Sequence, residues 1–282
     1  MKQINGNVAV VTGGGSGIGR ALATAFAAEG ASVVVADILE QNARSVADEI
    51  TAKGGAAVPA TCDVSDRAAV KRLKAEANAA FGPVTLLFAN AGVTSFERLT
   101  DMSEQDLDWI VQVDLMGVAN CLSAFLPDMY AAHRGHVVAT GSMAGVLPGW
   151  IPYHSAYSSA KAGVLGLMMN LRNEAAEFGV GATVLCPGGV ETSLKYNNSL
   201  YRPDRFGGPQ QASVRIPEGS FKQEIIFRAP EEVAQMVLDS VRENRPMVVT
   251  DPTMRKAFME SYVSVVLEAF DHADAFDRRT KQ

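Results

Sequence analysis

Short apolar runs alternate along the chain with longer stretches whose hydrophobic residues recur every three or four positions. Runs of four to eight apolar residues are typical of buried strands, and the longer spacing is typical of helices with one buried face. The runs predict strands at Val8–Val11, Ser32–Ala36, Ala57–Thr61, Leu86–Ala89, His136–Thr140, Ala182–Cys186 and Met247–Thr250. The helical spacing fits Ile18–Glu29, Gln41–Lys53, Asp66–Phe81, Ser103–Tyr130, Ser155–Glu177 and Pro230–Glu243.

This alternation predicts an α/β fold, a doubly wound parallel β-sheet of the Rossmann type with helices on both faces. No linker or change of composition divides the chain, so we expect a single domain over residues 1–282. Sheets of this kind bind ligands at the carboxyl ends of their strands. Residues suited to a site stand just after predicted strands, at Asp37, Asp63, Asn90, Ser142 and Pro187.

A glycine-rich segment, Thr12–Gly19, joins the first predicted strand to the first predicted helix. Glycines let the backbone turn sharply and approach a pyrophosphate, which the amides at a helix N-terminus then bind. A glycine-rich surface turn is the alternative, but the flanking strand and helix favour a nucleotide site. Asp37 directly follows the second predicted strand, near the spacing expected for an acidic residue that binds a ribose hydroxyl.

Tyr157 and Lys161 lie four positions apart in a predicted helix and therefore share one face. A tyrosine with a pKa of about 10 is a poor base at neutral pH, but a neighbouring ammonium favours the phenolate and lowers that pKa. Ser142, on a different segment, offers a hydroxyl to hold an alcohol oxygen. An exposed helix face can carry the same Tyr-x-x-x-Lys pattern, so the pair indicates a catalytic site only in combination with the upstream motifs.

Taken in order along the chain, these motifs resemble those of the short-chain dehydrogenases/reductases, from about Asn5 to Thr250. The resembling segments are Thr12–Gly19, Asp63-Val64, Asn90-Ala91-Gly92, Ser142, Tyr157 with Lys161, and Pro187-Gly188-Gly189-Val190-Glu191-Thr192. In that family the Asp-Val pair contacts adenine, and the segment after Pro187 binds the nicotinamide end.

The resemblance implies an NAD-dependent oxidoreductase that transfers a hydride between the cofactor and a secondary alcohol or ketone. It implies catalytic roles for Ser142, Tyr157, Lys161 and, as a relay position, Asp114. The implied cofactor-binding residues are Gly13, Ser16, Gly17, Ile18, Gly19, Asp37, Asp63, Val64, Asn90, Tyr157, Lys161, Pro187, Gly188, Val190 and Thr192.

Two positions depart from the family pattern. Ala89 stands where the family has the first of two asparagines, a residue that supports the central strand. Asp114 stands where the family has the asparagine that holds a water in the proton relay. An ionised Asp114 would pair with Lys161 and weaken its effect on Tyr157, whereas a buried, protonated Asp114 would behave more like the amide.

Asp37 predicts a preference for NAD, because its carboxylate would repel the 2′-phosphate of NADP; Arg20 is the one nearby cation that could oppose this. Residues 193–228 have little regular pattern, and we expect them to form a substrate lid. Aromatic residues of this segment and Met143, Leu147 and Trp150 are candidates for the pocket wall, whereas Lys195, Arg202 and Arg205 could contact a polar substrate group. The aromatic lid residues are Tyr196, Tyr201, Phe206, Phe221 and Phe227.

We therefore expect a hydrophobic or aromatic substrate. The sequence Ser199–Pro203 loosely resembles members of the family that oxidise aryl carbinols in lignin-fragment breakdown. A steroid or other alicyclic alcohol is the alternative substrate. A non-catalytic nucleotide-binding regulatory protein is the alternative of another class, since fold alone does not establish function.

Composition fits a cytoplasmic enzyme. The 282 residues are 48% hydrophobic and carry a net charge of −6, so no basic surface indicates nucleic acid. No apolar run approaches the ~20 residues that cross a membrane, and the first residues show no secretory signal. Three cysteines suit a reducing compartment, and no Cys/His spacing predicts a metal site.

The resemblance also implies a homo-oligomer, a tetramer or dimer, paired through the long predicted helices Ser103–Tyr130 and Ser155–Glu177. Beyond Thr250 we expect a C-terminal helical extension over residues 251–282. Its hydrophobic residues over Pro252–Phe270 have near-helical spacing, which predicts an amphipathic helix that packs on the body or on a neighbouring subunit.

Overall fold

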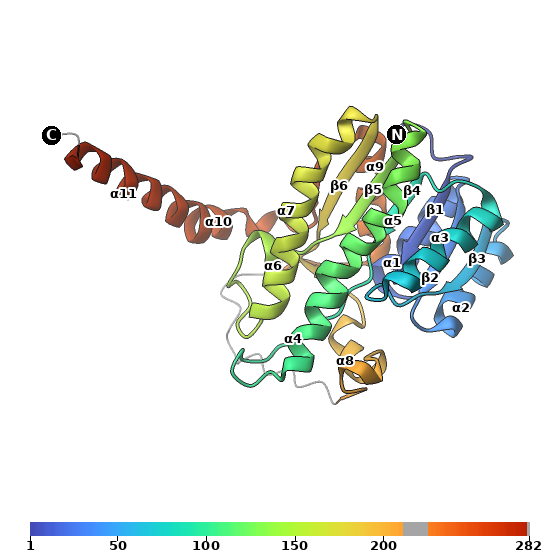
Figure 1. Ribbon diagram of the computed structural model, residues 1–282, viewed down its shortest axis with the longest axis horizontal. Coiled ribbons are helices and arrows are strands. Elements are labelled where there is room, and N and C mark those ends of the chain that lie inside the picture. The colour runs from blue at the N-terminus through green and yellow to red at the C-terminus, as the bar shows by residue number, and fades with distance from the viewer. Residues whose placement is uncertain (211–224, 281–282) are drawn as a thin grey trace.

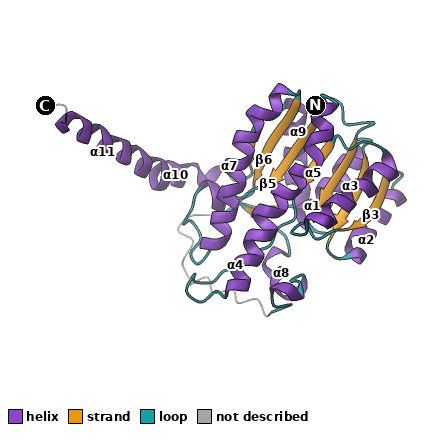
Figure 2. Ribbon diagram, in the orientation of Figure 1, coloured by secondary structure: helices purple, strands orange, loops and turns teal. Residues whose placement is uncertain are grey.

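A parallel sheet with helices on both faces forms the centre of the computed structural model, which describes residues 1–210 and 225–280 (Figure 1). Within these residues the main sheet has seven strands in the order β3-β2-β1-β4-β5-β6-β9, and this confirms the predicted Rossmann-type fold (Figure 2). The strands are β1 Val8–Thr12, β2 Ser32–Asp37, β3 Ala56–Thr61, β4 Leu86–Ala89, β5 Gly135–Thr140, β6 Val180–Cys186 and β9 Met247–Val249. A two-stranded sheet joins β7, Gly189–Val190, to β8, Phe227–Arg228.

Two buried clusters hold the layers together. One packs Leu73, Phe125 and Met168 against one face of the sheet, and the other packs Phe26 and Val237 against the opposite face. The first face is covered by α3 (Arg67–Phe81), α5 (Gly117–Ala131) and α7 (Ser155–Glu177), and the second by α1 (Gly17–Ala28), α2 (Glu40–Ala52) and α9 (Pro230–Glu243). Because the strands are covered on both faces, their sequences are continuous apolar runs rather than alternating ones.

The long helix predicted over Ser103–Tyr130 is interrupted. The chain forms α4, Glu104–Val111, then a π-helical turn, Gln112–Met116, and then α5. A π turn adds one residue to a single helical turn, which a hydrophobic spacing of three to four does not reveal, and such turns often occur at functional sites. Of the described residues, only the stretch Glu104–Ala131 is long and apolar enough to cross a membrane by composition, and most of that window is buried inside the protein.

The predicted lid, residues 193–228, is less irregular than its sequence indicates. Its described part contains a 3₁₀ turn at Leu194–Tyr196, the short helix α8 (Asn197–Leu200), a second 3₁₀ turn at Asp204–Phe206 and strand β8. Phe221 lies outside the described residues. Figure 1 shows α8 below the sheet and beside α4.

The C-terminal extension is helical through α10, Arg255–Phe258, a π turn at Met259–Val263 and α11, Ser264–Thr280. It leaves the body and projects away from it (Figure 1). Met254 is buried and Ala257 packs against the core, but no side chain of 255–280 is buried. Of the two alternatives for this helix, packing on its own body is not found, because the contacts with the body end near its first turn; packing on a neighbouring subunit stays a prediction.

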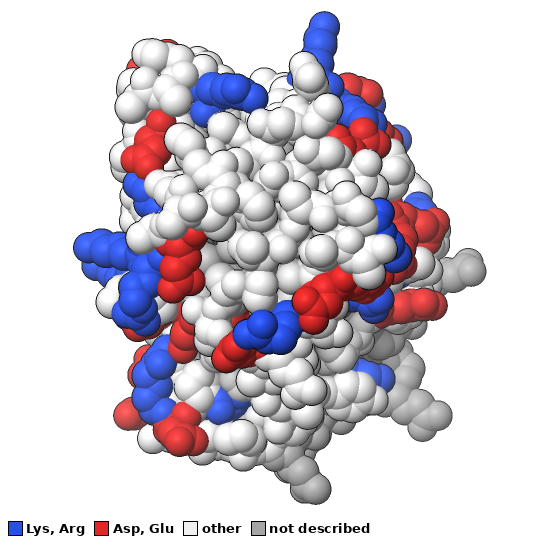
Figure 3. Space-filling model, turned by 90° about the vertical axis from the view of Figure 1, so that its right-hand side faces the viewer, with Lys and Arg blue, Asp and Glu red and all other residues white. Residues whose placement is uncertain are grey.

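Charges on the surface are mixed in sign. On the face shown in Figure 3, Lys and Arg side chains lie close to Asp and Glu side chains. A broad uncharged area lies between these mixed clusters. Basic side chains do not gather into one large patch on that face.

Candidate active site

One cavity lies at the carboxyl edge of the sheet and is lined by the segments that follow β1, β2, β3, β4, β5 and β6. It brings together nearly all the residues predicted to act in catalysis or to bind the cofactor; only Gly19 and Asp114 do not line it. The predicted residues in its wall are Gly13, Ser16, Gly17, Ile18, Asp37, Asp63, Val64, Asn90, Ser142, Tyr157, Lys161, Pro187, Gly188, Val190 and Thr192. Parallel strands explain this convergence, because their carboxyl ends meet at one edge.

The glycine loop after β1 has the close packing that a nucleotide loop requires. Gly13 has a φ of +61°, and a Cβ on Gly19 would lie 2.0 Å from the carbonyl oxygen of Gly13. Gly19 therefore shapes the loop from behind rather than lining the cavity. Ser16 is the N-cap residue of α1 but its side chain makes no capping hydrogen bond, which leaves first-turn amides available to an anion.

Asp37 places a carboxylate beside this loop. Its two oxygens accept hydrogen bonds from the amides of Gly15 and Leu39, both at 3.0 Å. Burial raises the pKa of Asp37, and the amide hydrogen bonds oppose that shift. Arg20 points elsewhere, since its Nε and Nη2 lie 3.0 and 2.8 Å from Glu49 Oε2 on α2. The loop, the helix terminus and Asp37 together thus fit the binding of a dinucleotide.

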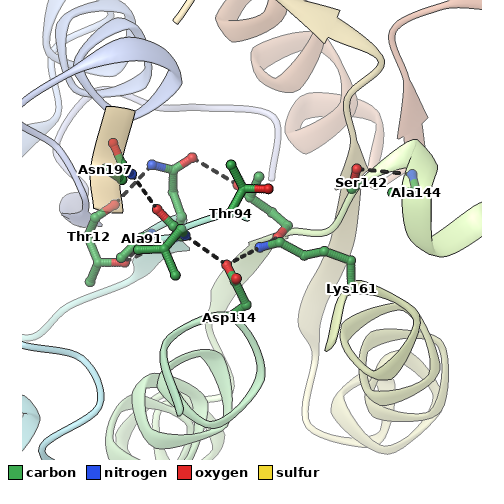
Figure 4. Close-up of polar contacts among 12 residues, drawn as sticks. Thr12, Ala91, Thr94, Asp114, Ser142, Ala144, Lys161 and Asn197 are labelled. Atoms are coloured by element: carbon green, nitrogen blue, oxygen red, sulfur yellow. Dashed lines mark hydrogen bonds and ion pairs between the residues drawn. The ribbon is translucent and has the colours of Figure 1, made fainter. Parts of the chain in front are cut away.

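Tyr157 and Lys161 occupy the first two turns of α7 and face the same side, as predicted. Tyr157 is 7% exposed and Lys161 is 2% exposed, and the Lys161 Nζ lies 5.5 Å from the centre of the Tyr157 ring. Ser142, the N-cap residue of α6 (Met143–Val146), accepts a hydrogen bond from the amide of Ala144 at 3.0 Å (Figure 4). Ser142 and Tyr157 both line the cavity, and the Ser142 side chain acts to lower the pKa of Tyr157.

Opposing effects act on the pKa of Tyr157. Burial raises it, the ammonium of Lys161 lowers it, and the carboxylate of Asp114 raises it again; the net pKa is above that of a free tyrosine. For Lys161, burial lowers the pKa, but Asp114 and Tyr157 raise it and prevail. Lys161 also donates to the carbonyl oxygen of Thr140 at 3.0 Å, which holds its ammonium in place.

Asp114 lies behind Lys161, in the π-helical turn, and is fully buried. Its Oδ1 is 3.0 Å from the Lys161 Nζ and accepts a hydrogen bond from the Val93 amide at 3.1 Å (Figure 4). Its Oδ2 has no hydrogen-bond partner among the described residues. Burial raises the pKa of Asp114 and Lys161 opposes that shift. Of the two alternatives for this residue, the contact geometry favours the ion pair.

Some residues of the cavity wall have no signal in the motifs. Trp109 and Val113 come from the α4 side, Val93 follows the Asn-Ala-Gly motif, and Asn197 donates from the lid to the carbonyl oxygen of Gly92 at 3.0 Å. Tyr201 and Pro203 of the lid also line the cavity. Their positions depend on how α4 and the lid pack against the rest of the protein, and short sequence motifs do not predict that packing.

Several candidates for the pocket wall are located elsewhere. Met143 and Leu147 are buried in the core, because α6 turns inward after Ser142. Trp150 is also outside the wall of the cavity.

The lid cations do not face the cavity. Arg202 pairs with Asp106 and stacks over Trp109, Arg205 pairs with Asp63, and Lys195 lies over the Tyr196 ring. Over residues 1–210 and 225–280, no group of three His, Cys, Asp or Glu side chains could hold a metal ion.

Comparison with known proteins identifies relatives of this arrangement. The short chain dehydrogenase family model matches residues 7–201. The C alpha-dehydrogenase of Sphingobium sp. (strain NBRC 103272 / SYK-6) is 30% identical over 271 residues, which are 94% of this chain and 87% of that protein. The probable oxidoreductase EphD of Mycobacterium tuberculosis is 34% identical over 240 residues, 84% of this chain, but the chain spans only 40% of that relative's length.

Solved structures agree over almost the whole chain. A short-chain dehydrogenase/reductase from Burkholderia phymatum, in complex with NAD, has a TM-score of 0.85 at 30% identity and covers 95% of this chain and 97% of its own. The apo form of LigO from Sphingobium sp. strain SYK-6 has a TM-score of 0.80 at 30% identity and covers 100% of this chain and 96% of its own.

Proposed function

Since the chain belongs to the short-chain dehydrogenase/reductase family of oxidoreductases, we propose that it transfers a hydride between NAD and a secondary alcohol or ketone. The observation that carries this proposal is the convergence of Ser142, Tyr157 and Lys161 in the wall of the cavity that also contains the glycine loop and Asp37. A nucleotide site and a proton acceptor in one cavity are what alcohol oxidation requires.

In this proposal the alcohol oxygen lies between the hydroxyl groups of Ser142 and Tyr157. Tyr157 accepts the hydroxyl proton while the hydride leaves the carbinol carbon, and Ser142 holds the oxygen in place. Lys161 acts to lower the pKa of Tyr157, and it would also help to hold the nicotinamide ribose of the bound cofactor. Bound NAD supplies the acceptor for the hydride. In the reverse direction Tyr157 returns the proton to a ketone oxygen.

The residues around the glycine loop support NAD as the cofactor. Asp37 can accept from both ribose hydroxyls, and its carboxylate would repel a phosphate at the 2′ position. Arg20, which could have compensated for that phosphate, is held by Glu49. The Burkholderia phymatum relative, with NAD in its structure, is consistent with this choice.

The apolar part of the cavity wall supports a neutral, aromatic or hydrophobic substrate. Val93, Trp109, Val113 and Tyr201 give the cavity an apolar and aromatic lining. The lid cation that lies closest to Trp109, Arg202, is neutralised by Asp106. An aryl carbinol suits such a wall, and the C alpha-dehydrogenase relative adds weight to this choice. A steroid or alicyclic alcohol is the alternative, because the same side chains would also pack against a saturated ring.

We further propose that the chain acts as a homo-oligomer, a tetramer or dimer, in the cytoplasm. The projecting helix exposes large hydrophobic side chains, among them Val265, Leu267, Phe270 and Phe276, which a second copy of the chain would cover. The three cysteines, Cys62, Cys121 and Cys186, are buried and unpaired, as suits a reducing compartment.

A panel of secondary alcohols tests this function. Aryl carbinols, alicyclic alcohols and hydroxysteroids would each be incubated with the enzyme and NAD while the absorbance of the reduced cofactor is followed. We expect turnover with at least one class and the highest kcat/KM with aryl carbinols. Binding of NAD without turnover of any class, in either direction, would instead support the nucleotide-binding regulatory protein.

A further inference from the structure

Three aromatic rings form one stack behind the cavity, and Tyr157 is its innermost member. The ring of His154 lies 4.4 Å from that of Tyr157 with an interplanar angle of 16°. On its other face, His154 stacks on Phe96 at 4.6 Å and 12°. His154 is 5% exposed and does not line the cavity, so it supports Tyr157 from behind rather than touching a substrate.

Two distant segments of the chain hold His154 in this position. Thr94, itself buried, places its Oγ1 2.8 Å from the His154 Nε2. Tyr153, just before His154, has a φ of +57°, an uncommon conformation for a residue with a Cβ. The Tyr153 hydroxyl accepts a hydrogen bond from Arg98 at 3.3 Å. The segment after β4 and the turn before α7 are thus joined by several contacts, and His154 is at their centre.

The charge of the His154 ring distinguishes it from Lys161. Burial lowers the pKa of His154 to about 4, so the ring is neutral at neutral pH. The groups whose charge affects Tyr157 are Lys161, Asp114 and the thiol of Cys186. Removing His154 would therefore leave the electrostatic environment of Tyr157 nearly unchanged, whereas it would remove the ring that restrains Tyr157.

We propose that His154 is a positioning residue, which holds the Tyr157 ring by stacking and fixes its hydroxyl for proton transfer. This proposal rests on the proposed function. A general base must lie within about 3 Å of the proton that it takes, and a misplacement of about 1 Å can cost on the order of 100-fold in rate. A phenol ring can tilt and slide in its plane unless another surface packs against its face, and the His154 ring provides that surface.

Two substitutions separate stacking from hydrogen bonding. His154→Phe keeps a flat ring between Phe96 and Tyr157 but loses the contact with Thr94, whereas His154→Gln keeps a polar partner for Thr94 but loses the ring. We expect His154→Gln to lower kcat for alcohol oxidation at least about tenfold, with the affinity for NADH unchanged. His154→Phe should stay within about threefold of the wild type, because stacking does not require a ring nitrogen.

A matched control is available at the far end of α7. Phe178 stacks on Tyr130 at 4.3 Å and 7°, outside the cavity, so Phe178→Gln removes a ring from a similar stack. This variant should retain the kcat of the wild type. If the His154 variants do not fold, Phe96→Leu tests the same stack from its half-buried outer ring, and it should also lower kcat without weakening NADH binding.

The measurements are kcat and KM for the alcohol, the Kd of NADH by its fluorescence, and the pH profile of kcat. The proposal is supported if kcat falls in His154→Gln and Phe96→Leu, stays near the wild-type value in His154→Phe, and keeps the same pH profile in all three variants. The proposal is overturned if His154→Gln turns over like the wild type, if His154→Phe is as slow as His154→Gln, or if the alkaline limb moves. If the wild type oxidises no alcohol, both the proposed function and this inference are wrong. If the wild type is active but the variants do not behave as expected, only the inference is wrong.

Discussion

The Oδ1 atom of Asp114 lies 3.0 Å from the Nζ atom of Lys161, and both side chains are buried. A carboxylate so close to the ammonium partly cancels its field at the neighbouring Tyr157. The cation that should promote the phenolate is therefore itself stabilised by an anion. We therefore expect this pairing to influence the pH range in which Tyr157 acts as a base.

The first prediction concerns Asp114→Asn. Asp114 raises the pKa of Tyr157, so replacing its charge with a neutral amide should lower that pKa. Oxidation requires Tyr157 without its proton, and the rise of kcat with pH should consequently move to lower pH in the variant. Stopped-flow turnover with the best alcohol across the alkaline range would measure this. An unchanged pH profile with unchanged turnover would mean that Asp114 has no part in setting the basicity of Tyr157.

The second prediction is a preference for NAD over NADP. Repulsion between Asp37 and a 2′-phosphate that costs about 1.4 kcal/mol changes affinity tenfold, so we expect a ratio of kcat/KM values of at least about ten. Asp37→Ser should reduce this ratio by relieving the repulsion. Arg20→Ala is the matched control and should leave the ratio unchanged, because Arg20 pairs with Glu49. Equal or better use of NADP by the wild type would refute the assignment of Asp37.

The third prediction concerns the docking of the lid. Arg202 has a fully buried side chain and pairs with Asp106, and removing one partner of a buried ion pair costs about 3 to 5 kcal/mol. Arg202→Met should lower the free energy of opening of residues 197–206 by about that amount. The Arg205 side chain is 48% exposed, so Arg205→Met should cost less than about 1 kcal/mol. Hydrogen exchange of the lid amides measures both, and equal effects would show that burial of the Arg202 pair does not hold the lid.

The fourth prediction concerns the projecting helix. Phe270→Glu places a charge on its exposed apolar face and should reduce assembly, whereas Glu268→Gln changes a polar position nearby and should not. Light scattering of the 29.9 kDa chain at micromolar concentration would report the mass of each variant. If wild type and Phe270→Glu have the same mass, the exposed apolar face has no role in assembly.

Much of the fold could be predicted from the sequence. Strand β4 has the predicted bounds, Leu86–Ala89, because a strand buried on both faces is a continuous apolar run between polar neighbours. The glycine loop and Asp37 also lie where expected, because the position of each is determined by a few residues at the end of a strand. The regular elements and most of the cavity wall therefore depend on local patterns.

Features that depend on distant packing could not be predicted in this way. The π turn at Gln112–Met116 adds one residue without disturbing the apolar face, and the stack of Phe96 on His154 joins segments far apart in the chain. The sequence predicts a substrate contact for Arg202, but its side chain pairs with Asp106 on α4, a partner that lies far away in the sequence. The direction of the last helix also depends on tertiary packing. Its amphipathic pattern predicts that one face is covered, but it does not indicate which surface covers that face.

The central claim is that Tyr157 is the proton acceptor of an NAD-dependent alcohol oxidation, and Tyr157→Phe tests it most directly. The variant keeps the ring that stacks on His154 and lacks only the hydroxyl. Initial rates of NADH formation from the best secondary alcohol, with the Kd of NADH measured in parallel, decide the matter. We predict a loss of about 100- to 10,000-fold in kcat with NADH binding retained. A variant that oxidises the alcohol within a few-fold of the wild-type rate would contradict the claim.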